Sequence, residues 1–218
     1  MGRYPCLVLD HDDTVVQSME MSYDFFLYIL EQFRPGTRFS LEEYILDCHN
    51  LGFVGMCRQR FGFTDAELKN EHSQWMAYLQ THVPDSYPGI ENVIRRQKEE
   101  GGLLCVVSHS SYENISRDYK VHLGFQPDAI YGADLPAHQR KPSPWPLEDI
   151  MQRYNLKPSD ILVVDDMKLA WDMASRVGVQ TAFAAWGKLD FPALCREMEA
   201  LCDFTFRTVE ELEAFLFN

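Results

Sequence analysis

The sequence predicts an α/β fold in which a doubly wound parallel sheet is interrupted by an inserted all-helical domain. One observation is that short apolar runs without helical spacing end abruptly in polar residues, as residues 7–9 do before Asp10. This pattern is typical of buried strands. A second observation is that such runs alternate with helical patterns after residue 85, which indicates a parallel sheet with right-handed crossovers. A third is that residues 17–84 carry only helical patterns and are far too long for an ordinary connection.

The inserted segment, residues 17–84, is predicted to form several helices. Apolar and aromatic residues recur through 21–33 and predict the first of them. Ser40 and Thr64 each precede a glutamate by three residues, the capping-box pattern with which a helix begins. Residues 49–62 contain three glycines and are predicted to form a loop.

The rest of the chain is predicted to form the sheet and its covering helices. After the first strand, apolar runs predict four more strands, at residues 103–107, 129–131, 161–164 and 181–184. Helices are predicted at residues 88–100, from a capping box at Ser110 to about Gly124, after Pro146 and at residues 168–177, followed by two closing helices of which Thr208 caps the last. We therefore expect two domains, residues 1–16 plus 85–218 and residues 17–84. The insertion directly follows the first strand, where it is placed to become a lid.

Composition excludes several classes of protein. The chain has 218 residues, of which 46% are hydrophobic and 24% charged, as in ordinary globular proteins. A net charge of −13 argues against non-specific binding to nucleic acid or anionic lipid. No long apolar run resembles a membrane span, and the first residues lack the layout of a signal peptide, so we expect a cytoplasmic protein. The six scattered cysteines favour reduced thiols over disulfides or a zinc site.

The end of the first predicted strand carries three aspartates, Asp10, Asp12 and Asp13. Two carboxylates separated by one residue can divide catalytic work, one attacking as a nucleophile while the other transfers protons or orients a metal. Taken alone, the stretch fits a solvated, Asp-rich turn better. The other strand ends change this interpretation.

Three further polar sites follow predicted strands. Ser108 precedes a capped helix, and a hydroxyl with a helix N-terminus can cradle a phosphate, although serine-rich turns are common. Lys141 stands beside prolines that restrict its backbone, which suits a fixed positive charge, although a surface lysine is the commoner case. Asp165 and Asp166 form a second acidic pair that is hard to explain without a cation such as Mg2+.

These motifs, in this order, resemble those of the haloacid dehalogenase (HAD) superfamily. The positions that match its four motifs are Asp10, Asp12 and Thr14, then Ser108, then Lys141, then Asp165 and Asp166. The resemblance covers the whole chain and implies a Rossmann-like core. The insertion is similar to the family's helical C1-type cap, as in the phosphoglycolate phosphatase and β-phosphoglucomutase branches.

The resemblance implies a role for each matching position. Asp10 would attack phosphorus to form an aspartyl-phosphate, and Asp12 would protonate the leaving oxygen and then activate water. Magnesium would bind Asp10, the Asp12 backbone carbonyl and Asp166. The phosphoryl group would be held by Ser108, His109 and Lys141, and the supporting residues would be Thr14 and Asp165.

Two positions depart from the family pattern. Asp13 stands where glycine is usual, and His109 stands where asparagine is frequent. Asp13 adds a charge beside the nucleophile and restricts the backbone there. A side chain that points outward would accommodate it.

We expect a magnesium-dependent phosphatase that acts on a small phosphorylated metabolite. A sugar-phosphate mutase and a weakly catalytic phosphate-binding protein remain alternatives. The dehalogenase branch usually lacks the second aspartate, present here as Asp12, and the phosphonate-cleaving branch needs a cap lysine, whereas Lys69 stands at an ordinary helical position. Within the predicted loop 49–62, His49 and Arg58 could meet the leaving group, and a connecting turn with solvated arginines fits equally well. We expect a monomer or weak dimer without nucleic-acid or membrane partners.

Overall fold

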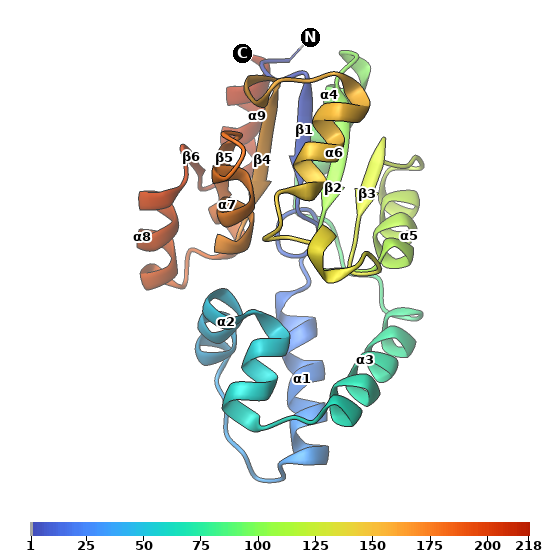
Figure 1. Ribbon diagram of the computed structural model, residues 1–218, viewed down its shortest axis with the longest axis vertical. Coiled ribbons are helices and arrows are strands. Elements are labelled where there is room, and N and C mark those ends of the chain that lie inside the picture. Colours follow the sequence, from blue (N-terminus) through green and yellow to red (C-terminus); the bar gives the residue numbers. More distant parts are fainter. Residues whose placement is uncertain (1) are drawn as a thin grey trace. The chain divides into compact units, whose positions relative to one another are not determined.

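The computed structural model describes residues 2–218, which divide into two compact units (Figure 1). The core unit comprises Met1–Gln17 and Asp85–Asn218, and the helical unit comprises Ser18–Pro84. No helix among the described residues is both long and apolar enough to cross a membrane. All six cysteines are free thiols.

The core unit is built on a parallel sheet, as the sequence predicts, with six strands instead of the five expected. The strand order is β3-β2-β1-β4-β5-β6, so β1 lies in the middle between β2 and β4. The strands are β1 (Cys6–Leu9), β2 (Leu103–Val107), β3 (Ala129–Tyr131), β4 (Ile161–Asp165), β5 (Gln180–Ala184) and β6 (Phe204–Phe206). The sequence analysis missed β6. This edge strand has only three residues, too few for alternation to be recognised.

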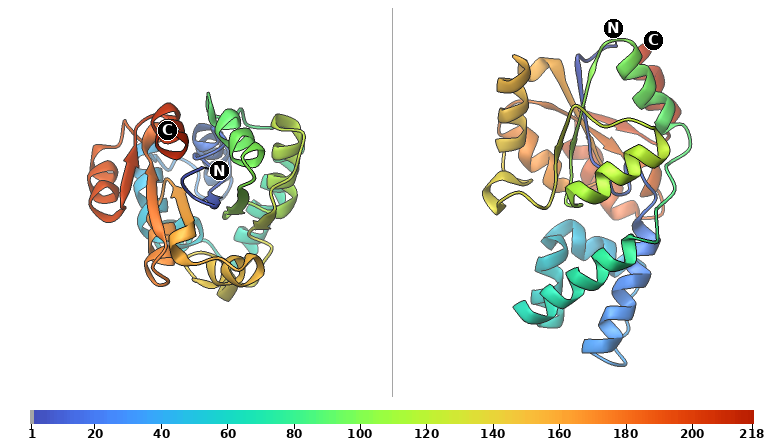
Figure 2. Two further views of the ribbon diagram at one scale, coloured as in Figure 1. Left: turned by 90° about the horizontal axis from the view of Figure 1, so that it is seen from above. Right: turned by 90° about the vertical axis from the view of Figure 1, so that its right-hand side faces the viewer.

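Helices connect the strands and cover both faces of the sheet (Figure 2). They are α4 (Ile90–Glu99), α5 (Tyr112–His122), α6 (Trp145–Tyr154), α7 (Lys168–Ser175), α8 (Pro192–Leu201) and α9 (Val209–Phe217). The capping box predicted at Thr208 is confirmed. The one predicted at Ser110 is wrong, because Ser110 N donates to Ser108 Oγ and the cap of α5 is Ser111, whose hydroxyl accepts from Asn114 N.

Burial on both faces explains why the strands read as continuous apolar runs. In β1, Leu7 and Leu9 pack into one hydrophobic cluster with side chains of α4, α5 and α9. Cys6 and Val8 point the other way and pack with side chains of α6 and α7. The central strand is therefore fixed from two sides, and the loop that follows it starts from a rigid base.

The helical unit contains α1 (Met19–Phe33), α2 (Leu41–Phe61) and α3 (Asp65–Leu79). The capping boxes predicted at Ser40 and Thr64 are confirmed. The loop predicted at residues 49–62 is wrong, since most of this segment belongs to α2. Gly52 alone leaves helical geometry (φ 68°, ψ 159°), so one glycine absorbs a kink and hydrogen bonding resumes beyond it.

Aromatic rings fill the interior of the helical unit. Phe26 of α1 is 1% exposed. Its ring lies within 6.3 Å, between centroids, of the rings of Phe39, Tyr44, Phe53, Phe61 and Phe63. Rings at such separations contribute both buried area and favourable edge contacts. A carboxylate, Glu71 of α3, is also buried in this unit.

Candidate active site

The carboxyl ends of the central strands bring the predicted motif residues to one edge of the sheet. Leu9 of β1 is in register with Val106 of β2 and Val164 of β4. The next residue, Asp10, donates its backbone N–H to Val164 O at 3.0 Å. Since all three strands are parallel, the residues that follow them must emerge side by side, which is where open α/β sheets bind ligands.

Lys141 joins two of these strand ends through its ammonium group. Its Nζ lies 2.7 Å from Asp165 Oδ2 and 3.0 Å from Asp10 Oδ1. The lysine is only 6% exposed. Burial alone would lower the pKa of Lys141, but Asp10 and Asp165 outweigh it and raise the pKa above its ordinary value. Lys141 is therefore a permanent, fixed positive charge beside the Asp10 carboxylate.

The two adjacent aspartates at the end of β4 are bound differently. Asp165 has both oxygens occupied, Oδ2 by Lys141 and Oδ1 by the backbone N–H of Met167 at 2.8 Å. Asp166 is 2% exposed, and its Oδ1 has no hydrogen-bond partner among the described residues. Burial raises the pKa of Asp166 to about 7 and that of Asp165 well above its usual range. A cation at Asp166 Oδ1 would offset this penalty.

The donor set fits a divalent cation. Asp10, Asp165 and Asp166 can each direct one carboxylate oxygen to a common point, with these oxygens within 4.8 Å of one another. Hard oxygen donors of this kind, with few carboxylates, suit Mg2+. Because Asp165 is already engaged by Lys141 and Met167, Asp10 and Asp166 are the carboxylates best placed to hold it.

The turn after β2 carries Ser108 and His109, the two residues of this turn that are predicted to bind phosphate. Ser108 is buried, and its Oγ accepts from Ser110 N at 3.1 Å. His109 Nε2 lies 2.8 Å from the backbone carbonyl of Lys141, so this nitrogen carries the hydrogen and donates it. Although the His109 side chain is exposed, partial desolvation of its ring and the nearby Lys141 charge lower its pKa. The ring thus fixes the lysine backbone at this edge.

The remaining first-motif residues lie in the turn after β1. Asp12 is half-buried and forms an isolated bridge with Val16. Thr14 is fully buried, and its Oγ1 has no partner among the described residues. Its backbone carbonyl accepts from Trp186 Nε1 at 3.2 Å. The backbone of Thr14 is therefore one of the groups that join this turn to the rest of the core unit.

Asp13 does not point outward, so that expectation is wrong. The side chain is buried, and Oδ2 lies 2.7 Å from Nζ of Lys188, a residue the sequence analysis did not single out. The same ammonium lies 3.0 Å from Asp166 Oδ2. Nothing in the local sequence distinguishes Lys188 from a surface lysine. Only the unusual Asp13 hinted that a buried cation must exist nearby.

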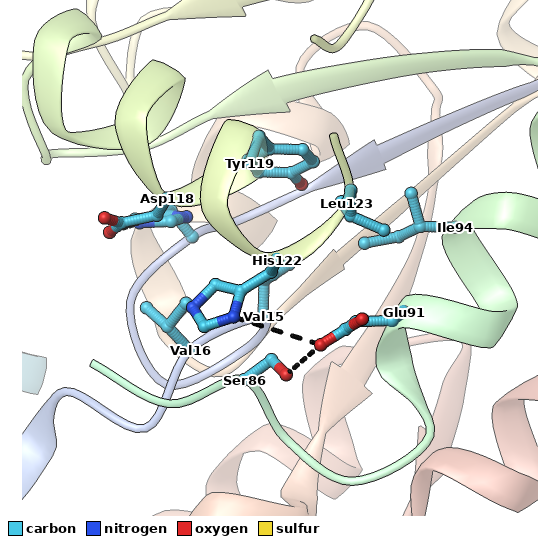
Figure 3. A pocket seen from close by; sticks show the side chains of 10 residues that line it. Val15, Val16, Ser86, Glu91, Ile94, Asp118, Tyr119, His122 and Leu123 are labelled. Carbon is cyan, nitrogen blue, oxygen red and sulfur yellow. Dashed lines mark hydrogen bonds and ion pairs between the residues drawn. The ribbon is translucent and has the colours of Figure 1, made fainter. Parts of the chain in front are cut away.

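The sequence analysis also did not single out His11, which stands between the two candidate catalytic aspartates. It is 1% exposed, and its Nε2 lies 3.0 Å from Oδ2 of Asp118 in α5, 107 residues away. Asp118 also pairs with Arg117 at 2.6 Å. Figure 3 shows that this part of α5 lines a pocket together with Val15 and Val16 of the turn after β1. Helix α5 therefore braces the turn that carries Asp10 and Asp12.

The two candidate cap residues lie within the helical unit. His49 is 2% exposed. Arg58 is exposed, with Nη2 2.6 Å from Asp65 Oδ1. Both belong to α2, so the predicted loop that would carry them is wrong, and a kink at Gly52 separates the two residues.

The fold and this edge of the sheet define a class of enzyme. The family model described as haloacid dehalogenase-like hydrolase matches residues 7–184, and the chain belongs to this family. It is accordingly a hydrolase, as the sequence predicts.

Individual proteins similar to the chain share only 17–30% sequence identity with it. The chain is 26% identical over 196 residues to the pyrophosphatase PpaX of Listeria innocua, covering 85% of each chain. It is 30% identical over 102 residues to the phosphoglycolate phosphatase of Aquifex aeolicus, covering 46% of this chain and 47% of that protein. The structure of CbbY from Rhodobacter sphaeroides, solved with xylulose-(1,5)bisphosphate, superimposes with a TM-score of 0.75 at 17% identity, covering 99% of this chain and 100% of that one. This last likeness concerns the fold.

Proposed function

We propose that this chain is a magnesium-dependent phosphatase that hydrolyses a small phosphorylated metabolite through an aspartyl-phosphate. The observation that carries the proposal is the Lys141 ammonium between Asp10 and Asp165, beside the unpartnered oxygen of Asp166. This one edge combines a nucleophile, a fixed positive charge and a cation site. The names of the relatives, a pyrophosphatase and a phosphoglycolate phosphatase, agree with phosphate-ester or phosphoanhydride hydrolysis.

The first half-reaction is attack of the Asp10 carboxylate on phosphorus. A new bond forms between a carboxylate oxygen and phosphorus, and the bond from phosphorus to the leaving oxygen breaks. Asp12 donates a proton to that oxygen, so that an alcohol or phosphate departs rather than a more basic anion. Lys141 neutralises negative charge on the transferring phosphoryl group, because its ammonium is fixed beside the nucleophile.

The second half-reaction is hydrolysis of the aspartyl-phosphate. Asp12, now ionised, takes a proton from water as the water oxygen attacks phosphorus. The bond between Asp10 and phosphorus breaks, and inorganic phosphate and the free carboxylate are released. Asp12 ends protonated and is ready for the next turnover. Its half-buried position is consistent with access to water and leaving group.

Asp10, the Asp12 backbone carbonyl and Asp166 are proposed to hold the magnesium ion, whose charge would stabilise the phosphoryl oxygens. Ser108 and the backbone of His109 are proposed to bind the same phosphoryl group. Asp165 is proposed to orient Lys141, since both of its oxygens are engaged by this lysine and by a backbone N–H.

The helical unit, Ser18–Pro84, is proposed to act as a cap that selects the substrate. All the proposed catalytic residues lie in the core unit, whereas the helical unit is inserted just after Asp12. A segment inserted there can contact the leaving group and exclude water. The buried free thiols favour a reducing compartment such as the cytoplasm.

A phosphate-release screen tests the proposed function. Purified protein is incubated with Mg2+ and 2-phosphoglycolate, pyrophosphate or a hexose 1-phosphate, with Asp10→Asn as the inactive control. We expect Mg2+-dependent release of inorganic phosphate from at least one substrate by the wild type alone. Isomerisation of the hexose phosphate faster than phosphate release would instead establish a mutase. No turnover of any compound in a broad metabolite panel would leave a phosphate-binding protein.

A further inference from the structure

Lys188 is a fully buried lysine outside the four motifs of the family resemblance. It is 0% exposed, and its Nζ contacts Asp13 at 2.7 Å and Asp166 at 3.0 Å. Burial by itself would lower the pKa of Lys188, but Asp166 and Asp13 raise it above its ordinary value. The residue is therefore a second internal ammonium, in direct contact with a proposed cation ligand.

The segment that carries Lys188 is packed against the turn after β1. Trp186 Nε1 donates to the backbone carbonyl of Thr14 at 3.2 Å. A Cβ added at Gly187 would come within 2.3 Å of Tyr87 Oη and 3.3 Å of Asp13 O, so any larger residue there would require Tyr87 to move. The closely packed backbone of Trp186 and Gly187 therefore holds Lys188 near Asp13.

Both the backbone conformation and the burial of Asp13 are unfavourable for an aspartate considered by itself. Its φ of 55° lies in the left-handed region, which is strained for an aspartate and unstrained for glycine. A buried carboxylate without a partner destabilises the fold further. The contact with Lys188 removes the second penalty, and Lys188 likewise needs a carboxylate in order to remain charged in the interior.

The net charge of this edge is the same when Asp13 and Lys188 are both present and when both are absent. Two buried ammonium groups here contact four buried carboxylates, since Lys141 contacts Asp10 and Asp165 and Lys188 contacts Asp13 and Asp166. When a bound cation offsets the burial of Asp165 and Asp166 and all six groups are ionised, four carboxylates and two ammonium groups leave two negative charges, which one divalent cation neutralises. Without Asp13 and Lys188, three carboxylates and one ammonium group leave the same two charges. Removing only Asp13 or only Lys188 changes this net charge by one.

We propose that Asp13 and Lys188 are a charge-matched pair that sets the strength of cation binding at Asp166. The charge of Lys188, in contact with Asp166 Oδ2, opposes a cation at Oδ1, while Asp13 cancels that positive charge. Neither residue touches the substrate in this proposal. The inference rests on the proposed magnesium site.

Calorimetric titration of Mg2+ into metal-stripped protein at pH 8 tests the pair. Asp13→Asn should weaken Mg2+ binding by at least about tenfold, because one uncompensated positive charge remains beside Asp166. Lys188→Met should tighten binding by about tenfold, because one more negative charge remains. The double variant should return to within about threefold of the wild type. A merely structural role would weaken binding in both single variants.

A control variant distant from the cation site and a substitute for Lys188→Met complete the test. Lys98→Met removes one positive charge from an ion pair with Asp128, which accepts from Leu104 N near the start of β2, at the opposite edge of the sheet. It should leave the affinity unchanged. Should Lys188→Met not fold, Asp13→Glu should retain Mg2+ affinity within about threefold while Asp13→Asn loses it, and equal affinities of these two variants would overturn the pair.

Three results contradict the inference. Shifts of Mg2+ affinity in the same direction for both single variants would refute it, as would a double variant that binds no better than the weaker single one. A shift in Lys98→Met as large as that in Lys188→Met would reduce the effect to overall charge. Wild-type protein that binds no Mg2+ would overturn the proposed cation site itself, and the inference with it.

Discussion

Replacing the buried Glu71 by glutamine should stabilise the protein at alkaline pH and leave its stability unchanged at acidic pH. Glu71 is 7% exposed in α3, and burial raises its pKa from 4.5 to about 7. The folded state therefore binds more protons than the unfolded state between these two values. The free energy of unfolding must fall as the pH rises through this window and remain low above it.

The size of the effect follows from the pKa difference. At roughly 1.4 kcal/mol per pKa unit, the ionised Glu71 costs the folded state about 3 kcal/mol at pH 8. Glutamine has nearly the same shape and no charge to desolvate. Glu71→Gln should therefore gain about 2–3 kcal/mol relative to wild type at pH 8. The gain should shrink to nearly zero below pH 5, where the wild-type carboxyl is protonated.

Hydrogen exchange of the α3 amides in the full-length protein measures this difference within the helical unit. Opening free energies are compared for wild type and variant at pH 5, 6, 7 and 8. Glu42→Gln, the same change at an exposed position of α2, is the matched control and should show no pH-dependent gain. Equal opening free energies of wild type and Glu71→Gln at pH 8, or wild-type α3 that becomes more stable from pH 5 to 8, would refute the reasoning.

Four further outcomes are expected. Asp10→Asn should abolish phosphate release while the circular dichroism spectrum is unchanged, and a purified variant with near wild-type turnover would end the covalent mechanism. EDTA should inactivate the enzyme, Mg2+ should restore it and Ca2+ should restore it poorly, while Asp166→Ala should mimic chelation; full activity without any divalent ion would contradict this. Asp118→Asn should lower kcat about tenfold or more with little change in KM, because His11 loses the charged partner that orients the turn, whereas a change in KM alone would contradict this role. Arg58→Ala should lower kcat/KM for the preferred anionic substrate and spare p-nitrophenyl phosphate; equal losses on both would make the helical unit structural rather than selective.

Local patterns determined the features that depend on near neighbours in the chain. The predicted strands of the core unit stand out because they are buried on both faces and therefore read as uninterrupted apolar runs. The capping boxes at Ser40, Thr64 and Thr208 are confirmed because each hydrogen bond joins residues three positions apart. The order of the motif residues at strand ends was likewise visible, since strand periodicity and its abrupt stop are local properties.

Local patterns failed where distant residues or packing decide the outcome. Residues 49–62 look like a loop because glycines interrupt the helical pattern, yet within α2 only Gly52 departs from helical geometry, and Gly62 ends the helix. β6 is too short to show alternation and forms by pairing with β5. In each case tertiary contacts outweigh a propensity of less than about 1 kcal/mol per residue.

The chain by itself therefore determined the fold class, the family and the set of residues at the strand ends. Only the tertiary structure decided how the charges among them are balanced. Lys188 is joined to Asp13 across 175 positions, and His11 to Asp118 across 107. No local pattern marks either pair, because a buried charge is tolerated only through a partner that folding supplies, and that partner can lie anywhere along the chain.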